Sequence, residues 1–312
     1  MANHDLPAPT PHPAFLTDDS LDVLRFAADA FAGGVATVLV TLVEIRGGAA
    51  RPLGAHMAVR EDGLYCGFVS GGCVERAVAF EALDVIALGG DRQMRYGQGS
   101  PYIDIVLPCG GGITLSLHRL RCAQPLWAVL AAAEQRRPAG LRYDPAQQTL
   151  QSLAHGVGTG WKGQRFEVGY RPCTRVLILG RSAEAEVTAR LAQAAGYEVH
   201  ASDGAEPGAL SALIDADTAV VLLFHDLDRE LPILQAALAA MPFYIGALGS
   251  HRTHQVRVRT LAGLGYLAQD IARIKAPIGI FPKARDAGSL ALSVLADVAA
   301  ARNGVPGKTE AF

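Results

Sequence analysis

Residues 175–203 read RVLILGRSAEAEVTARLAQAAGYEVHASD, and this stretch decides the fold class of the chain. The apolar run Val176–Leu179 predicts a buried strand, and Gly180 after it predicts a tight turn. Apolar positions at helical spacing over Ala183–Ala195 predict a helix, and Tyr197–Ala201 predicts the next strand. This order of strand, turn, helix and strand is typical of the βαβ unit of a parallel sheet.

The same alternation continues along the second half of the chain. It predicts strands at Ala219–Phe224 and Phe243–Ala247, and helices near Leu231–Ala240, His254–Leu264 and Ser289–Ala301. We therefore predict an α/β chain whose residues 172–312 form a Rossmann-like, doubly wound parallel sheet.

The first half of the chain has a different pattern, in which strands outnumber helices. A long β-rich strand is predicted at Val35–Ile45, and shorter strands are predicted at Ala55–Val59, Leu64–Val69, Gln93–Tyr96, Ile103–Leu107 and Ile113–Leu117. The stretch from Gln135 to Gly163 is rich in Gly, Pro, Gln and Arg, which predicts a linker or an irregular edge. We predict a mixed α+β domain over residues 1–165.

Length and composition limit the classes of function. With 312 residues, 50% of them hydrophobic, the chain is long enough for two domains. A formal charge of −2 and a pI of about 6.5 favour neither a nucleic-acid nor an anionic-membrane partner. The longest apolar run, Val35–Val43, is far shorter than the roughly 20 residues that span a bilayer, so no transmembrane helix is expected. The first residues lack the basic and apolar regions of a signal peptide, which predicts a cytoplasmic protein.

Cys73 is the first candidate for a binding site. The five cysteines include no Cys-x-x-Cys pair, which favours free thiols over a disulfide scaffold or a structural zinc site. Cys73 follows Gly71 and Gly72 at a predicted helix start, where unpaired N–H groups favour a thiolate and glycines let an anion or a bulky ligand approach. We predict that it ligates a metal, although a small buried apolar residue would also fit this position. Glu75 is either an acid/base group or a partner of the helix dipole.

Two further positions in the first half are weaker candidates. Cys109 precedes Gly110 and two more glycines, which indicates either a second ligand or a wide turn between strands. Arg51 lies in a turn with Pro52 and Gly54, where it is a candidate for binding an anion.

The turn after Leu179 departs from the dinucleotide fingerprint Gly-x-Gly-x-x-Gly. Gly180 is retained, but Ser182 replaces the middle glycine and Glu184 places a carboxylate at the helix start, so both disfavour a pyrophosphate. Asp203 has the spacing expected for a ribose contact. We expect a Rossmann fold that has lost its redox cofactor.

A second anion site is predicted at the segment Gly249–His254, which follows an apolar strand and opens a basic helix. Gly249, Ser250 and Arg252 are the candidate contacts, with Arg257 on the same predicted helix. The alternative is a helix with a solvated basic face.

In combination these motifs resemble the XdhC/CoxI family, the accessory proteins that help to mature molybdenum hydroxylases. The most telling motifs are Gly71–Glu75, Cys109–Gly111, Tyr244–Ser250, and Ala276–Gly279 followed by the helix Ala291–Ala300. The resemblance spans nearly the whole chain and implies a cysteine-bearing N-terminal domain and a Rossmann-like C-terminal domain. It departs from the family at Gly180–Ser182, where a more regular Gly-x-Gly turn is usual.

The resemblance implies a chaperone, without catalytic residues of its own, that binds molybdenum cofactor through Cys73 and delivers it to an apo molybdenum hydroxylase of the xanthine dehydrogenase or aldehyde oxidoreductase type. It also implies cofactor sulfuration together with a cysteine desulfurase. The cofactor form, molybdopterin or its cytosine dinucleotide, stays open, as do the client enzyme and assembly into a homodimer.

Two other classes of function remain at this stage. An NAD(P)-dependent oxidoreductase has the right order of elements in its second half, but Ser182 and the lack of an obvious hydride-transfer site count against it. A thiol redox or metal-storage protein would need Cys73 and Cys109 close in space.

Overall fold

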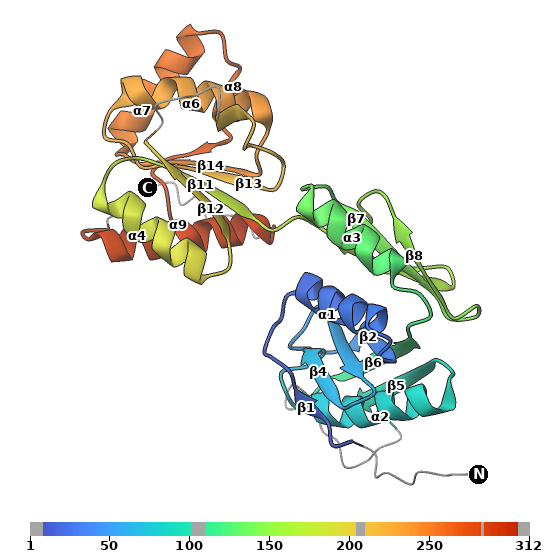
Figure 1. Ribbon diagram of the computed structural model, residues 1–312. Coiled ribbons are helices and arrows are strands. Elements are labelled where there is room, and N and C mark those ends of the chain that lie inside the picture. Colours follow the sequence, from blue (N-terminus) through green and yellow to red (C-terminus); the bar gives the residue numbers. More distant parts are fainter. Residues whose placement is uncertain (1–8, 101–109, 204–209, 282–283, 305–312) are drawn as a thin grey trace, which may run out of the picture. The chain divides into compact units, whose positions relative to one another are not determined.

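The computed structural model describes residues 9–100, 110–203, 210–281 and 284–304. Cys109 and the predicted strand Ile103–Leu107 lie outside the described residues. The chain divides into two compact units, Met1–Pro172 and Cys173–Phe312 (Figure 1). Each unit has hydrophobic cores of its own.

A six-stranded sheet forms the centre of the first unit. Its strands, in spatial order, are β1 (His12–Pro13), β4 (Leu64–Gly67), β3 (His56–Arg60), β2 (Thr37–Arg46), β6 (Gly112–Arg119) and β5 (Arg92–Gly97). All neighbours are antiparallel except β1 and β4. Helix α1 (Ser20–Ala32) packs on one face with residues such as Leu24, and α2 (Glu75–Leu88) packs on the other with residues such as Val78.

A second, antiparallel sheet of four strands follows helix α3 (Gln124–Glu134). Its order is β8 (Thr149–Leu153), β7 (Ala139–Asp144), β10 (Arg165–Tyr170) and β9 (Gly160–Lys162). The prediction of a linker or irregular edge over Gln135–Gly163 is therefore wrong. These strands are short and carry many polar residues. Side chains such as Leu141 and Phe166 enter the core, but they are too few to produce a clear alternation of apolar and polar residues along each strand.

The second unit is doubly wound, which confirms the predicted fold class. Its five strands are all parallel, in the order β12 (Glu198–Ser202), β11 (Arg175–Leu179), β13 (Thr218–Leu222), β14 (Tyr244–Ala247) and β15 (Ile274–Lys275). Helices α4 (Ala183–Ala194) and α9 (Ala287–Arg302) cover one face, and α6 (Leu227–Ala240), α7 (His251–Gly263) and α8 (Ala268–Ile271) cover the other (Figure 1).

A buried carboxylate explains why the Ala276–Gly279 motif and the last helix occur together. Asp297 of α9 accepts hydrogen bonds from the Tyr244 hydroxyl at 2.7 Å and from the Gly279 N–H at 3.3 Å, and it pairs with Lys275. Burial raises the pKa of Tyr244, so its hydroxyl stays a donor. These contacts fix the segment after β15 to α9.

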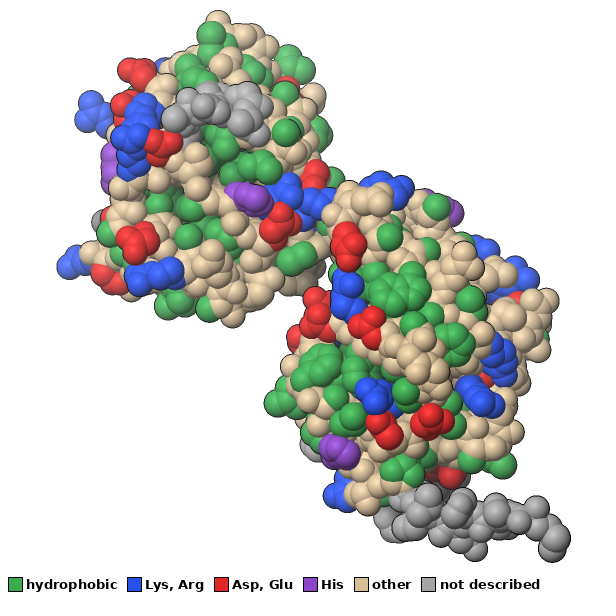
Figure 2. All heavy atoms as spheres, in the orientation of Figure 1, with side chains coloured by type: hydrophobic (Ala, Val, Ile, Leu, Met, Phe, Trp, Pro, Cys, Tyr) green, Lys and Arg blue, Asp and Glu red, His purple; other side chains and the backbone are tan. Residues whose placement is uncertain are grey.

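The distribution of surface charge and the length of the helices bear on two expectations from the sequence, namely that no nucleic-acid or anionic-membrane partner is favoured and that no helix spans a membrane. On the face drawn in Figure 2, acidic and basic side chains are interspersed. None of the helices in the described part of the chain combines the length and the apolar character needed to cross a membrane.

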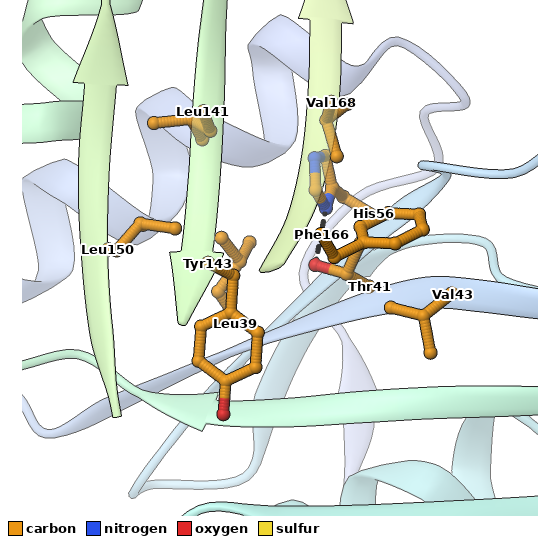
Figure 3. Close-up of a pocket in the computed structure, with 9 residues that line it drawn as sticks. All are labelled: Leu39, Thr41, Val43, His56, Leu141, Tyr143, Leu150, Phe166 and Val168. Atoms are coloured by element: carbon orange, nitrogen blue, oxygen red, sulfur yellow. Dashed lines mark hydrogen bonds between the residues drawn. The ribbon is translucent and has the colours of Figure 1, made fainter. Parts of the chain in front are cut away.

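His56 joins the two sheets of the first unit. Its Nε2 lies 2.5 Å from the Tyr170 hydroxyl of β10, and its Nδ1 lies 3.1 Å from the Thr41 hydroxyl of β2. Both His56 and Thr41 border a cavity with room for about one water molecule, lined otherwise by apolar and aromatic side chains (Figure 3). Burial lowers the pKa of His56 to about 4, so the imidazole is neutral in the folded protein at pH 7.

The depressed pKa of His56 predicts a loss of stability in mild acid. An unfolded histidine binds a proton below about pH 6.5, whereas the folded one does so only near pH 4, so stability is full above pH 6.5 and falls as the pH drops toward 4. The loss attributable to this residue is about 3 kcal/mol. We expect urea unfolding of His56→Gln to depend less steeply on pH in this window. The exposed His155→Gln should behave like the wild type, and equal slopes for all three proteins would contradict the assignment.

Candidate functional site

Three loops of the first unit leave the six-stranded sheet at the same end. The register pairs Arg46, the last residue of β2, with Gly112, the first residue of β6. Gly67 at the end of β4 pairs with Met57 near the start of β3. The β2–β3 loop, the loop after β4 that carries Cys73, and the segment before β6 that carries Gly110 therefore start from one edge.

Glycine at position 111 lets two of these loops approach each other through their backbones, and Gly71 brings the third loop near the same turn. A Cβ added to Gly111 would lie 2.2 Å from the Gly48 carbonyl oxygen, so only glycine fits there. A Cβ on Gly71 would lie 3.4 Å from the Ala50 Cβ on the other side of the same turn. The turn 47–50 thus lies between the Cys73 loop and Gly110–Gly111. We call the exposed backbone of residues 71–73 and 110, with the turn 47–50 between them, the glycine surface.

The glycine surface is open around two of its residues. Gly72 and Gly110 have φ values of +97° and +67°, a left-handed conformation that favours glycine. No described atom lies within 4 Å of the position that a Cβ would take at either residue. A ligand can therefore approach the main chain closely here.

Cys73 is an exposed free thiol on this surface. Helix α2 begins at Glu75, so Cys73 lies two residues before its first turn. The Cys73 N–H donates to the Ser70 hydroxyl at 3.2 Å, and the Val74 N–H donates to the Glu75 carboxylate at 3.2 Å. The expectation of unpaired N–H groups beside the thiol is therefore wrong for these two residues, because Glu75 folds back and uses donors of the helix start.

Glu75 is a buried structural group, which the sequence did not reveal. Its side chain accepts from the N–H groups of Val69 and Ser70 and from the Ser70 hydroxyl, all within the loop that precedes it. The exposed fraction of Glu75 is 2%, so it is neither a solvent-facing dipole partner nor placed as an acid/base group. No regular capping motif has this spacing, and only the tertiary structure shows the contact.

Arg51 is already engaged by the start of helix α1. Its Nη1 pairs with the Asp18 carboxylate at 2.9 Å, and its Nη2 donates to the Asp18 carbonyl at 2.8 Å. The Nε is buried and has no hydrogen-bond partner among the described residues. An anion would have to share Arg51 with Asp18.

Metal ligation by Cys73 would use fewer than three His, Cys, Asp or Glu donors in the described part of the chain. No group of three His, Cys, Asp or Glu side chains lies close enough there to hold a metal ion. Cys109, the second candidate ligand, is outside the described residues.

In the second unit, Gly249, Ser250 and Arg252 lie beyond the carboxyl end of β14. Ser250 caps α7, with its hydroxyl accepting from the Thr253 N–H at 3.2 Å, and Arg252 is exposed in the first turn. Gly249 has a φ of +133°. This is the edge of a parallel sheet where ligands bind in doubly wound folds.

Arg257 does not share this exposure, contrary to its expected place on a basic face. Its guanidinium forms a two-pronged pair with Glu230, and each side chain is 1% exposed. It also donates to the Leu248 carbonyl at 3.0 Å, so it supports the loop before Ser250 from inside. Glu230 lies 27 residues away in sequence, and no local pattern predicts the pair.

The turn at Gly180 is occupied by contacts within the protein. A Cβ on Gly180 would lie 2.7 Å from the Leu223 carbonyl oxygen, and Ser182 caps α4. Arg181 donates to the Asp203 carboxylate at 2.9 Å. The hydrogen bond with the Ser182 hydroxyl lowers the pKa of Glu184, which keeps a negative charge at this helix start. The loss of a redox dinucleotide stays a prediction.

Comparison with known proteins covers both units. The pattern of the XdhC and CoxI family matches residues 30–97, and that of the XdhC Rossmann domain matches residues 176–298. The chain is 63% identical over 292 residues to the molybdenum cofactor insertion chaperone PaoD of Escherichia coli (strain K12), covering 94% of this chain and 92% of that protein. It is 26% identical over 276 residues to the uncharacterized protein YqeB of the same organism, covering 86% of this chain but 44% of YqeB.

A solved structure has the same fold. It is described as a xanthine dehydrogenase (BH1974) from Bacillus halodurans, and it superposes with a TM-score of 0.71 at 19% identity. The match covers 94% of this chain and 98% of that one.

The buried ion pair between Arg257 and Glu230 predicts that charge reversal at two arginines of helix α7 affects the free energy of unfolding very differently. Arg257→Glu would leave two carboxylates buried together, and we expect it to lower the free energy of unfolding by about 3–5 kcal/mol. Arg252→Glu should change it by less than about 0.5 kcal/mol, because this side chain is exposed. Urea unfolding followed by circular dichroism measures both. Equal stability of the two variants would show that the Glu230 pair contributes nothing.

Proposed function

The chain belongs to the XdhC/CoxI family, and from this premise we propose that it is a chaperone that binds molybdenum cofactor on the glycine surface and inserts it into a molybdenum hydroxylase. The observation that carries the site is the meeting of the Cys73 loop, the turn 47–50 and Gly110–Gly111 at one end of a sheet. The similarity to PaoD over 94% of the chain supports the cargo.

The chemistry of the glycine surface suits this cargo. Molybdenum bound by sulfur donors prefers a soft ligand, which the exposed Cys73 thiol supplies. Backbone without side chains at Gly71, Gly72 and Gly110 leaves room for a flat pterin and offers N–H groups to its phosphate. A single thiol on an exposed loop also permits release, which a closed cage of several ligands would hinder.

The finer parts of the proposal concern the partners. We propose that the chain supports sulfuration of the cofactor together with a cysteine desulfurase, and that it would then deliver the cofactor to an apoenzyme of the xanthine dehydrogenase or aldehyde oxidoreductase type. We also propose the cytosine dinucleotide form as cargo. Within the second unit, we propose Gly249, Ser250 and Arg252 as contacts for a phosphate group.

Loss of the thiol should weaken cofactor binding without affecting the fold. The protein is purified from cells that make molybdenum cofactor, and bound molybdenum, pterin and nucleotide are assayed. Because Cys73 would be the metal ligand, we expect Cys73→Ala to retain at least about tenfold less cofactor and to activate the client less. Cys122→Ala removes another exposed free thiol and should match the wild type. Equal loading of all three proteins would refute the site.

A charge reversal on helix α7 tests the second contact. If Arg252 binds a phosphate, Arg252→Glu should lower cofactor affinity about tenfold, and the remaining binding should depend less on salt. Arg259→Glu changes another exposed arginine of the same helix and should have little effect. An unchanged affinity of folded Arg252→Glu at low ionic strength would leave this segment as a solvated helix start.

A further inference from the structure

We infer that Glu75 is the positioning residue for Cys73, and that it acts through Ser70 and the main chain of the loop 69–74. The inference rests on the proposed function, because it concerns how the cofactor thiol is held. Glu75 itself is buried and cannot touch a ligand on the surface.

The contacts of Glu75 span the whole loop. Oε1 accepts from the Val69 N–H at 3.1 Å and from the Ser70 N–H at 2.7 Å, which fixes the point where the chain leaves β4. Oε2 accepts from the Val74 N–H at 3.2 Å, which fixes the point where the chain enters α2. One carboxylate thus closes the loop at both ends.

Ser70 extends this hold to the cysteine itself. Its hydroxyl lies 2.9 Å and 2.8 Å from the two oxygens of Glu75, to which it donates. The same oxygen accepts from the Cys73 N–H at 3.2 Å. The main chain of Cys73 is therefore linked to the buried carboxylate by one intervening hydroxyl.

Glu75 is held rigidly by helix α2, and the loop 69–74 has a second neighbour at Gly71. Glu75 is the first residue of α2, whose residues Val78, Ala79 and Ala82 are fully buried against the sheet. On its other side the loop has Ala50 nearby, because a Cβ added to Gly71 would lie 3.4 Å from the Ala50 Cβ. A side chain fixed by a packed helix holds a reactive group more accurately than a free loop does.

The same contacts select which donors remain for a ligand. Four N–H groups of the loop already donate to the Glu75 carboxylate or to the Ser70 hydroxyl, namely those of Val69, Ser70, Cys73 and Val74. Within the described residues, those of Gly71 and Gly72 have no hydrogen-bond partner. A phosphate or another anionic group is thereby directed to the two glycines that immediately precede the thiol.

An amide cannot replace the carboxylate. Every hydrogen bond of Glu75 is one that it accepts, which an ionised carboxylate provides at both oxygens. In Glu75→Gln the NH2 group would face a backbone N–H, so at least one buried donor would lose its partner. The loop should then loosen while the rest of the unit stays folded.

Alkylation of the apoprotein with iodoacetamide tests the positioning without any cofactor. We expect the alkylation rate of the exposed Cys73 thiol to differ several-fold between Glu75→Gln and the wild type, and to a lesser degree between Ser70→Ala and the wild type, because the conformation of the loop around the thiol changes. Cys66 is 1% exposed and reports loss of the whole fold, so it should stay protected in both variants. Glu81→Gln alters another carboxylate of α2, one that pairs with Arg92 near the surface, and should react like the wild type. Mass spectrometry resolves each cysteine.

Cofactor loading of the same variants separates this inference from the proposed function. We expect Glu75→Gln to retain about tenfold less cofactor than the wild type, with Ser70→Ala between the two. If Cys73→Ala loses cofactor but Glu75→Gln and Ser70→Ala load and react like the wild type, the positioning role is wrong and the site stands. If Glu75→Gln retains little cofactor and its Cys66 is also alkylated, the variant has a fold defect and the positioning role is wrong. Full loading of Cys73→Ala would refute the site itself.

Discussion

The register of strand β2 is the constraint on which the candidate site depends. This central strand pairs with β3 on one side and β6 on the other, and the backbone hydrogen bonds leave no freedom to slide without turning every core side chain outward. Since β4 pairs in turn with β3, the loops after β2 and β4 and before β6 reach the same edge. The loop that carries Cys73 and the turn 47–50 lie at the same end of the sheet because of this pairing.

Buried charges in both units hold loops and elements in place. Glu75 closes the Cys73 loop, Arg257 and Glu230 support the loop before Ser250, and Asp297 ties the segment after β15 to the last helix. A buried ionised group is tolerated only when its hydrogen bonds are satisfied, so each of these residues specifies one local conformation. Cys73 and Arg252, which lie in or just after these supported loops, are exposed.

Sequence patterns predicted the second unit better than the first. Parallel strands such as Val176–Leu179 are buried on both faces and read as continuous apolar runs, and the helices between them have regular spacing. The strands β7, β8 and β9 were missed because they are short and because polar residues and glycines interrupt their apolar pattern. Arg257 was placed on the wrong side of its helix, because helical spacing does not reveal a carboxylate 27 residues away.

The sequence by itself determined the family and the doubly wound fold and made Gly71, Gly72 and Cys73 candidates for a site, because these follow from local periodicity and from short motifs. Only the tertiary structure decided what surrounds them. The approach of Gly71 to Ala50, that of Gly111 to Gly48, and the engagement of Arg51 by Asp18 join segments that are distant in the chain. The contacts of Glu75 are local in sequence, but its role depends on burial of its carboxylate, and burial is a property of the packed core rather than of any motif.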